Sequence, residues 1–271
     1  MRSFHCVIAR TMQEITDAQR LRWTVYGEEE GLLPASACAS GREIDALDYA
    51  DGTVHLLVHS GQEVVGTVRL LQPSAEGKRP PHGRLGLDLE AKIDLGALAA
   101  PGIRPAEVTR YCVLREYRRT GVTGALFQGL YAESVRRGLT HWVAGANMET
   151  DCAEDAALAY RVAHEKKLVS DCFRAEPRAD EPPQTPRKRP CYTEEQRQRA
   201  RGGELAGLTL PRTLALFASR MSARFIGPPV YDGYFNVFAL PLVAQLADVA
   251  ARGASVSARG RQAHSGAEAL V

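Results

Sequence analysis

Residues 107–138 read EVTRYCVLREYRRTGVTGALFQGLYAESVRRG, and this stretch predicts a strand, a glycine-bearing turn and a helix in direct succession. Residues 107–114 contain the β-branched and aromatic side chains that strands favour. Glycines occur in the turn at 118–124, and Gly138 ends the helix. A strand followed directly by a helix favours a sheet covered by helices.

The flanking segments extend this pattern in both directions. Downstream, residues 140–147 predict a further strand and residues 154–168 a further helix. Upstream, residues 53–59 and 63–71 are two aliphatic runs separated by a Ser-Gly-Gln turn, which predicts an antiparallel hairpin. The order predicts an α/β (α+β) fold with a mixed, mostly antiparallel sheet flanked by helices.

We expect one domain over residues 1–250. Residues 174–203 hold four prolines within 182–190, eight Lys/Arg and five Asp/Glu, with almost nothing apolar, so we interpret them as an exposed insertion. Their cationic part, residues 187–189, fits either an acidic carrier protein or a solvated loop. Residues 251–271 lack a core-forming pattern and predict a disordered tail.

The composition limits the classes of function. The 34 basic and 32 acidic residues leave a net charge of +2, which argues against nucleic-acid binding by the whole surface. The six cysteines are never closer than 19 residues, so they form no zinc or redox clip and suit a reducing compartment. The first 15 residues lack the apolar core of a signal peptide, and no run is long enough to predict a transmembrane segment. We therefore expect a cytoplasmic protein.

Three carboxylates fall within six residues, at Glu43, Asp45 and Asp48, directly before the first strand of the hairpin. Carboxylates at the edge of a hydrophobic core destabilise the fold unless they are paired with basic groups. Arg22 in the first helix and Arg69 in the second hairpin strand lie within reach if the hairpin folds back. The alternative is a solvated acidic loop.

Glu107 and Arg110 form a second candidate pair. In a regular strand, side chains alternate, so residues 107, 109 and 111 would face one side and residues 108, 110 and 112 the other. A β-bulge would turn one side chain toward the other and expose an unpaired N–H, as often happens beside active sites. The alternative is that both residues lie at the frayed start of a strand.

The turn between strand and helix is a candidate phosphate site. Its backbone N–H groups and the helix dipole can hold a phosphate, such as that of a phosphopantetheine arm. Glycines in such a turn can equally serve only to bend the chain. The residues in question are Arg118, Arg119, Gly121, Thr123 and Gly124.

A metal site is not expected. His55 and His59 face the same side of a predicted strand, but no third ligand is spaced to join them. Cys112 has no histidine in its local sequence, so we interpret it as a core residue. We also expect no tightly bound cofactor.

Four motifs in register carry a family resemblance. They are RLRWTVYGEE (20–29), EIDALD (43–48), VVGTVRL (64–70) and EVTR (107–110). Their order resembles that of acyl-homoserine-lactone (autoinducer) synthases and N-acyl amino acid synthases, both in the GNAT acyltransferase superfamily. The later motifs LPRTL (210–214) and IGPPVYD (226–232) are most similar to the N-acyl amino acid synthase branch, including acyltransferases associated with PEP-CTERM/exosortase systems.

This resemblance implies a GNAT-like fold and roles for the candidate residues. Glu107 matches the general base, with Arg110 and Glu43 beside it in the catalytic group. The residues implied to bind the acceptor are Arg22, Asp45, Asp48 and Arg69. The turn implied to bind phosphopantetheine comprises Arg118, Arg119, Gly121, Thr123 and Gly124. Thr123 replaces the small residue usual in acetyl-CoA users, which is compatible with an arm still attached to acyl carrier protein.

The implied activity is transfer of a long-chain acyl group from acyl carrier protein, or from acyl-CoA, to the amine of an amino acid or similar acceptor. Two enzymatic alternatives stay open: an acyl-homoserine-lactone synthase that uses S-adenosylmethionine, and an acetyl-CoA-dependent N-acetyltransferase. A non-enzymatic alternative is a catalytically inert module that binds the acyl carrier.

Overall fold

A single twisted sheet organises the molecule. The computed structural model describes residues 4–34, 40–73, 85–178 and 189–251. The strands in these ranges are β1 (Cys6–Ile8), β2 (Thr53–Ser60), β3 (Glu63–Leu71), β4 (Pro105–Val113), β5 (His141–Asn147), β6 (Arg224–Phe225), β7 (Val230–Asp232) and β8 (Val237–Gln245). Their order is β1-β2-β3-β4-β5-β8-β6, and β7 pairs with β8. β4 and β5 are parallel, whereas the other pairs are antiparallel.

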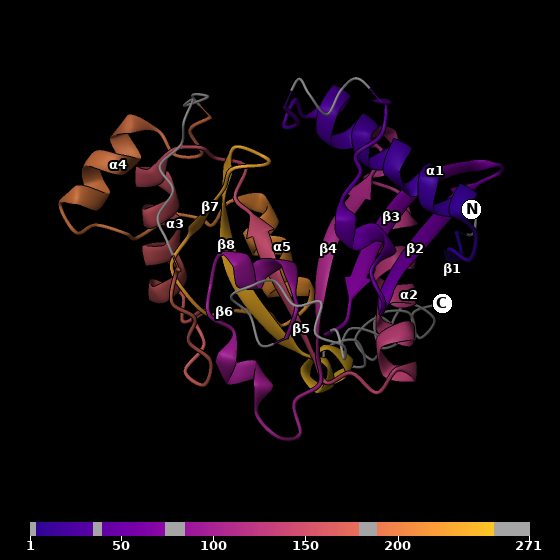
Figure 1. Ribbon diagram of the computed structural model, residues 1–271. Coiled ribbons are helices and arrows are strands. Elements are labelled where there is room, and N and C mark those ends of the chain that lie inside the picture. Colours follow the sequence, from indigo (N-terminus) through magenta and orange to yellow (C-terminus); the bar gives the residue numbers. More distant parts are fainter. Residues whose placement is uncertain (1–3, 35–39, 74–84, 179–188, 252–271) are drawn as a thin grey trace, which may run out of the picture.

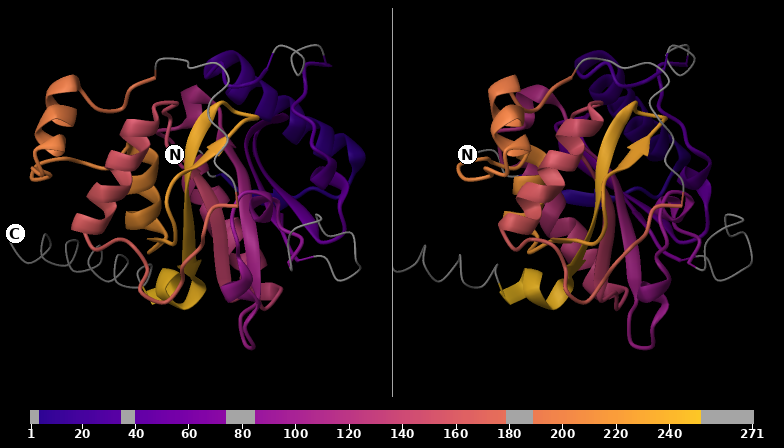
Figure 2. Two further views of the ribbon diagram at one scale, coloured as in Figure 1. Left: turned by 60° about the vertical axis from the view of Figure 1, so that its left-hand side comes forward. Right: turned by 90° about the vertical axis from the view of Figure 1, so that its left-hand side faces the viewer.

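Helices cover both faces of this sheet (Figures 1 and 2). The longer ones are α1 (Met12–Trp23), α2 (Val122–Arg136), α3 (Ala153–Glu165), α4 (Glu194–Arg201) and α5 (Arg212–Arg220). Short π- or 3-10 segments are η1 (Thr24–Glu29), η3 (Ala46–Tyr49), η4 (Asp88–Ala91), η5 (Gly96–Ala99) and η6 (Arg115–Tyr117). The expected mixed, mostly antiparallel sheet flanked by helices is confirmed.

Local sequence signals explain where several elements begin. Thr11 accepts a hydrogen bond from the backbone of Glu14, whose side chain bonds back, so a capping box starts α1. Gly66 lets α2 approach β3 closely, because a Cβ at this position would lie 2.7 Å from Val122. α2 therefore packs directly on the sheet, on the face opposite α1.

The neighbouring strands β4 and β5 separate along their length. They pair only from Pro105–His141 to Glu107–Val143, although β4 continues to Val113 and β5 to Asn147. The two strands diverge upward in Figure 1. Glu107 therefore stands at the last paired position, where the sheet opens.

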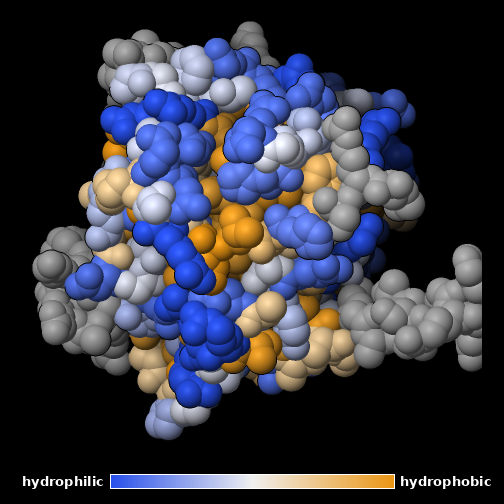
Figure 3. All heavy atoms as spheres, turned by 90° about the vertical axis from the view of Figure 1, so that its right-hand side faces the viewer, coloured by the Kyte–Doolittle hydropathy of each residue, from blue (hydrophilic) through white to orange (hydrophobic). Residues whose placement is uncertain are grey.

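The sheet edge at β1 is short and partly apolar. β1 has three residues, and Val7 in it is 42% exposed. Figure 3 looks onto this side of the molecule, where a band of hydrophobic residues is bordered by hydrophilic ones. A short edge strand offers few free backbone groups for pairing with another chain.

Part of the expected exposed insertion is packed. Among residues 189–203, Tyr192 and Ala200 are buried, and α4 lies against α3. Asp155 in α3 holds this segment through Arg197 at 2.6 Å and through the backbone N–H of Cys191 at 2.7 Å. These long-range contacts are invisible in the local composition, so the burial of Tyr192 and Ala200 does not follow from it. Residues 179–188 and 252–271, including most of the predicted tail, lie outside the described residues.

Within the described ranges, no helix combines the length and the apolar character needed to cross a bilayer.

Candidate functional site

Three arginines and three carboxylates form a closed ring of ion pairs. Each guanidinium contacts two carboxylates and each carboxylate contacts two guanidiniums. The pairs are Arg22–Asp48 at 2.6 Å, Asp48–Arg69 at 3.0 Å, Arg69–Asp45 at 3.0 Å, Asp45–Arg110 at 2.7 Å, Arg110–Glu43 at 3.0 Å and Glu43–Arg22 at 2.6 Å. We call these six residues the arginine–carboxylate ring.

Local structure fixes the carboxylates of the ring. Asp45 caps η3 by accepting the N–H of Leu47 at 2.6 Å, and Asp48 accepts the N–H of Asp45 at 3.2 Å. This capping box holds the two aspartates in one short turn. Gln19 in α1 adds a hydrogen bond to Asp48 at 2.9 Å. The turn thus presents its carboxylates to α1, β3 and β4.

Burial divides the ring into hidden and accessible members. The side chains of Arg22, Asp48 and Arg69 have no exposed surface, whereas Asp45 is 15% and Arg110 is 11% exposed. Burial alone would raise the pKa of Asp48, but hydrogen bonds and charge from Arg22 outweigh it and hold that pKa well below its usual range. The ring is neutral as a whole, so it satisfies its own charges.

A β-bulge at Arg110 brings this side chain to the ring. Arg69 pairs with Thr109 but Thr67 pairs with Cys112, so two residues of β4 oppose one of β3. Arg110 adopts a positive φ of 55°, which is uncommon for a residue with a side chain. The side-chain alternation shifts by one after Thr109, and Arg110 comes to lie on the same face as Glu107. The bulge considered from the sequence is present.

Glu107 is the buried carboxylate at the point where β4 and β5 separate. It is 3% exposed, and its Oε2 accepts the backbone N–H of Leu89 at 3.1 Å. Burial, followed by the negative charge of Asp88, raises the pKa of Glu107 to about 8. A carboxylate with a pKa near the working pH can exchange a proton with a substrate.

Several residues beside Glu107 and Arg110 were missed by the sequence reasoning. Asp88 Oδ2 lies 3.9 Å from Arg110 Nη1, and the rings of Tyr234 and Phe235 lie 5.9 and 5.2 Å from the Arg110 guanidinium carbon. The two aromatic residues belong to the turn between β7 and β8. The Asp-Gly sequence at 232–233 signals a turn, but its distance from β4 in the sequence gives no sign of this contact.

The predicted phosphate turn lies at the N-terminus of α2. Gly121 precedes the helix, and the first N–H groups of a helix have no partner within it. Tyr111 in β4 donates its hydroxyl to the carbonyl of Thr123 at 2.8 Å, which ties the turn to the sheet. Arg119 and Gly124 are exposed.

Arg118 in this turn already has anionic partners. Its Nη2 lies 2.6 Å from a carboxylate oxygen of Glu29 and 3.0 Å from one of Glu30. A donor phosphate that uses Arg118 therefore competes with two carboxylates.

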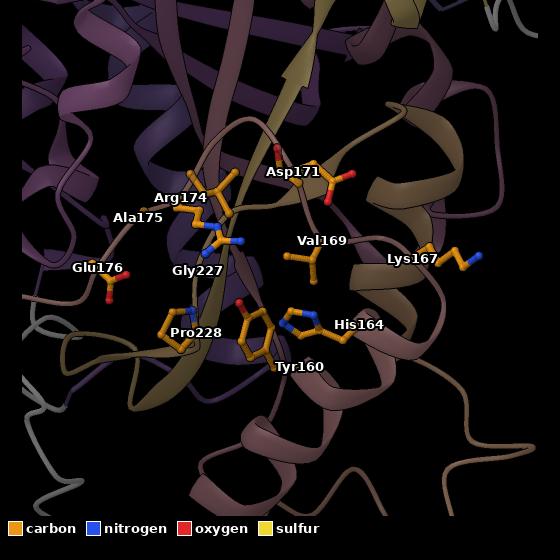
Figure 4. A pocket seen from close by; sticks show the side chains of 12 residues that line it. Tyr160, His164, Lys167, Val169, Asp171, Arg174, Ala175, Glu176, Gly227 and Pro228 are labelled. Carbon is orange, nitrogen blue, oxygen red and sulfur yellow. The ribbon is translucent and has the colours of Figure 1, made fainter.

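Two surface pockets lie away from the ring. One, with a volume of about 490 Å³, lies between the end of α3, residues 167–176 and residues 226–228 (Figure 4). Tyr160 and His164 stack edge to face in it, with ring centroids 4.6 Å apart. The other, of about 790 Å³, lies between α1, the β2–β3 turn and the end of β4. Neither pocket has Glu107 or a ring member in its lining.

Comparison with known protein families finds a match. Residues 21–128 match the model of the acetyltransferase (GNAT) domain. This part of the chain is therefore similar to GNAT acetyltransferase domains. The matched residues include the whole ring, Glu107 and the turn at 118–124, so all the candidate residues lie within the matched range.

Two curated relatives are ornithine acyltransferases. The L-ornithine N(alpha)-acyltransferase of Agrobacterium fabrum is 33% identical over 172 residues, which are 60% of this chain and 56% of that protein. The protein of the same name from Rhizobium meliloti is 29% identical over 174 residues, with the same coverage. The matched part of this chain thus spans about half the length of these relatives.

A solved structure supports the same fold. FeeM, an N-acyl amino acid synthase from uncultured soil microbes, is 12% identical, with a TM-score of 0.52. The superposition covers 92% of this chain and 94% of FeeM. The likeness extends the GNAT-like fold beyond residue 128 to most of the chain.

Proposed function

We propose that this protein is an N-acyltransferase that moves an acyl group from a thioester to the amine of an amino acid. The observation that carries the proposal is the position of Glu107, a buried carboxyl with a raised pKa at the point where β4 and β5 separate. Arg110 lies on the same face through the bulge. A general base and a cation at an opening in the sheet suit a substrate that carries both the amine to be acylated and a carboxylate.

The reaction is direct aminolysis. Glu107, in its ionised form, takes a proton from the acceptor ammonium, directly or through water. The free amine then attacks the carbonyl carbon of the acyl thioester, a C–N bond forms, and the C–S bond breaks. The attacking nitrogen then gives up its surplus proton to the departing donor thiolate, so the products are the amide and the free thiol, and no covalent enzyme intermediate is required.

Backbone donors at the bulge stabilise the oxyanion of this step. A bulge leaves backbone groups outside the ladder between strands. Beyond Glu107, β4 also runs without pairing to β5 as far as Val113. N–H groups fixed along this edge are preorganised for a developing negative charge and cost no rearrangement during the reaction.

The arginine–carboxylate ring positions the catalytic strand. The sequence assigned Arg22, Asp48 and Arg69 to the acceptor, and this stays a prediction. Their lack of exposed surface favours an indirect role, in which they hold the partly exposed members Asp45 and Arg110. Glu43, whose side chain is also buried, contacts Arg110 at 3.0 Å, which favours the same indirect role. Its assignment to the catalytic group stays a prediction.

The names of the two relatives favour ornithine as the acceptor. The matches cover 60% of this chain and 56% of each relative, so ornithine is the first acceptor to test. An amino acid acceptor also agrees with the mixture of acidic and basic groups around Glu107.

For the donor we favour a phosphopantetheine arm on an acyl carrier protein over free coenzyme A. Coenzyme A brings several phosphates, and any of them that uses Arg118 has to compete with Glu29 and Glu30. A carrier arm brings one phosphate, which the N-terminus of α2 suits. The basic residues Arg115 and Arg119 nearby suit an acidic carrier surface.

The test is product analysis with a panel of donors and acceptors. The purified protein is incubated with acyl carrier thioesters, acyl-CoAs and acetyl-CoA, each with a mixture of amino acids, and the products are identified by mass. An N-acyl amino acid formed by the wild type and lost in Glu107→Gln supports the proposal. Methylthioadenosine formed with S-adenosylmethionine would indicate a lactone synthase, and carrier binding without any acylated amine would indicate an inert module.

A further inference from the structure

We propose that Asp88 binds the side-chain ammonium of a diamino acid acceptor, and that Arg110 beside it binds the acceptor carboxylate. This inference rests on the proposed acyl transfer to an amino acid and adds the residue that selects the acceptor. Three side chains would then each contact a different group of the acceptor. Glu107 receives the proton of the reacting amine, Arg110 binds the carboxylate and Asp88 binds the second amine.

The geometry places Asp88 beside both partners. Asp88 begins η4, and the next residue, Leu89, donates its backbone N–H to Glu107 Oε2 at 3.1 Å. Asp88 Oδ2 lies 3.9 Å from Arg110 Nη1, too far for a hydrogen bond. The Asp88 side chain is 38% exposed, so it can reach a ligand from solvent.

The neighbouring charges are more fully engaged than Asp88. Asp45 contacts Arg69 and Arg110 at 3.0 and 2.7 Å. Asp232 contacts Lys92 at 2.7 Å. Of these partly exposed carboxylates, Asp88 has the longest contact with a cation, which leaves it the most available for a substrate ammonium.

Arg110 retains a donor for the acceptor carboxylate. Its Nε and Nη2 contact Glu43 and Asp45 at 3.0 and 2.7 Å, whereas Nη1 has the 3.9 Å contact with Asp88. An incoming amino acid can therefore place its carboxylate on Nη1 and its side-chain ammonium on Asp88 without breaking the ring. The exchange replaces one loose contact with two shorter charge-assisted hydrogen bonds.

The turn that carries Asp88 is held in place before any ligand arrives. Glu90, two residues later, is buried and accepts the backbone N–H groups of Leu85 and Leu87 at distances from 3.0 to 3.1 Å. Together with the hydrogen bond from Leu89 to Glu107, these contacts hold η4 against the preceding residues 85–87 and against β4. A preorganised carboxylate loses little conformational freedom on binding.

The same arrangement couples acceptor binding to the state of the base. The negative charge of Asp88 is one reason, after burial, that the pKa of Glu107 lies near 8. An ammonium bound at Asp88 offsets this charge and favours ionised Glu107. A diamino acid would therefore help to generate the ionised base that deprotonates its reacting amine, whereas a monoamino acid would not.

The decisive comparison uses ornithine and norvaline, which has the same carbon chain without the terminal amine. We expect the wild type to prefer ornithine in kcat/KM by roughly 10- to 100-fold, the value of one charge-assisted hydrogen bond. Measured above about pH 8, where Glu107 is ionised in both proteins, Asp88→Asn should reduce this preference to below about 3-fold through loss of activity with ornithine alone. Asp88→Glu should restore part of it, and Asp51→Asn, at an exposed aspartate of another turn, should leave it unchanged.

Binding without a donor separates this inference from the proposed function. Calorimetry should show tighter binding of ornithine than of norvaline to the wild type and equal binding to Asp88→Asn. A wild-type preference that survives in Asp88→Asn, or an equal loss with both acceptors, would overturn the role of Asp88 and leave the acyltransferase proposal intact. Selective ornithine binding without transfer from any donor would instead refute the acyltransferase proposal and retain the ammonium site.

Discussion

The arginine–carboxylate ring makes a quantitative prediction about stability. Asp48→Asn preserves the shape of the side chain but removes its charge, which leaves three arginines opposite two carboxylates. Asp48 contacts Arg22 at 2.6 Å and Arg69 at 3.0 Å, and neither arginine has exposed surface. The substitution therefore creates an excess positive charge that water cannot reach.

Breaking one partner of a buried ion pair costs about 3–5 kcal/mol. For a chain of this size, such a loss lowers Tm by about 10 °C. The matched control is Asp17→Asn, which removes a surface pair with Arg20 at 3.2 Å, where the arginine side chain is 60% exposed. Surface pairs contribute about 0–1 kcal/mol, so the control should shift Tm by less than about 4 °C.

The assay is urea and thermal unfolding followed by circular dichroism between pH 2 and 8. The folded pKa of Asp48 is lowered relative to its unfolded value near 4, so its stabilisation is fully present above about pH 5 and is lost as pH falls below about 4. The difference in free energy of unfolding between the wild type and Asp48→Asn should accordingly become smaller as the pH falls below about 4. A free energy of unfolding for Asp48→Asn within 1 kcal/mol of the wild type at pH 7 would refute the reasoning.

Three further outcomes are expected. Glu107→Gln should lower kcat/KM by about 10²- to 10⁴-fold through loss of the general base, as measured by product formation with the preferred donor, and an unchanged rate would remove Glu107 from that role. The kcat/KM of the wild type should rise with pH through about 8, because Glu107 acts as a base when it is ionised. Asp88→Asn should move this rise to lower pH, since the substitution removes a negative charge beside Glu107. An identical pH profile of the two proteins would contradict the coupling between Asp88 and Glu107. Gly66→Val should destabilise the fold by about 1–3 kcal/mol because its first side-chain carbon would lie 2.7 Å from Val122, whereas Gly124→Ala meets no atom within 4 Å and should not destabilise; thermal melts distinguish the two.

Features set by local sequence were predictable. The capping box at Thr11, the hairpin of β2 and β3 and the strand–turn–helix from β4 to α2 depend on neighbours a few residues apart. The order of the motifs also suggested that Arg22 and Arg69 meet the acidic cluster. The closure of the ring, in which every charged group has two partners, depends on the fold. It could not be deduced from the spacing of these residues in the sequence.

The missed features join segments that are far apart in the chain. Asp88 reaches Arg110 through an irregular segment whose 3-10 turn has no strong periodic signal. Glu29 neutralises Arg118 across 89 residues, and Asp155 holds Arg197 across 42. Composition describes such residues only as charged, and their role follows from which charges the folded chain brings together.

The bulge explains why the ring and the proposed base occur together. An arginine at positive φ is strained by about 1–2 kcal/mol, and such strain persists only where surrounding contacts over-determine it. Two ion pairs to the ring and two aromatic contacts supply those constraints at Arg110. In a regular β4, Arg110 would turn toward α2, away from Glu107, and Cys112 would leave the core beneath α1. The ring can therefore support catalysis without touching substrate, by keeping β4 in the one side-chain register that places Arg110 beside Glu107.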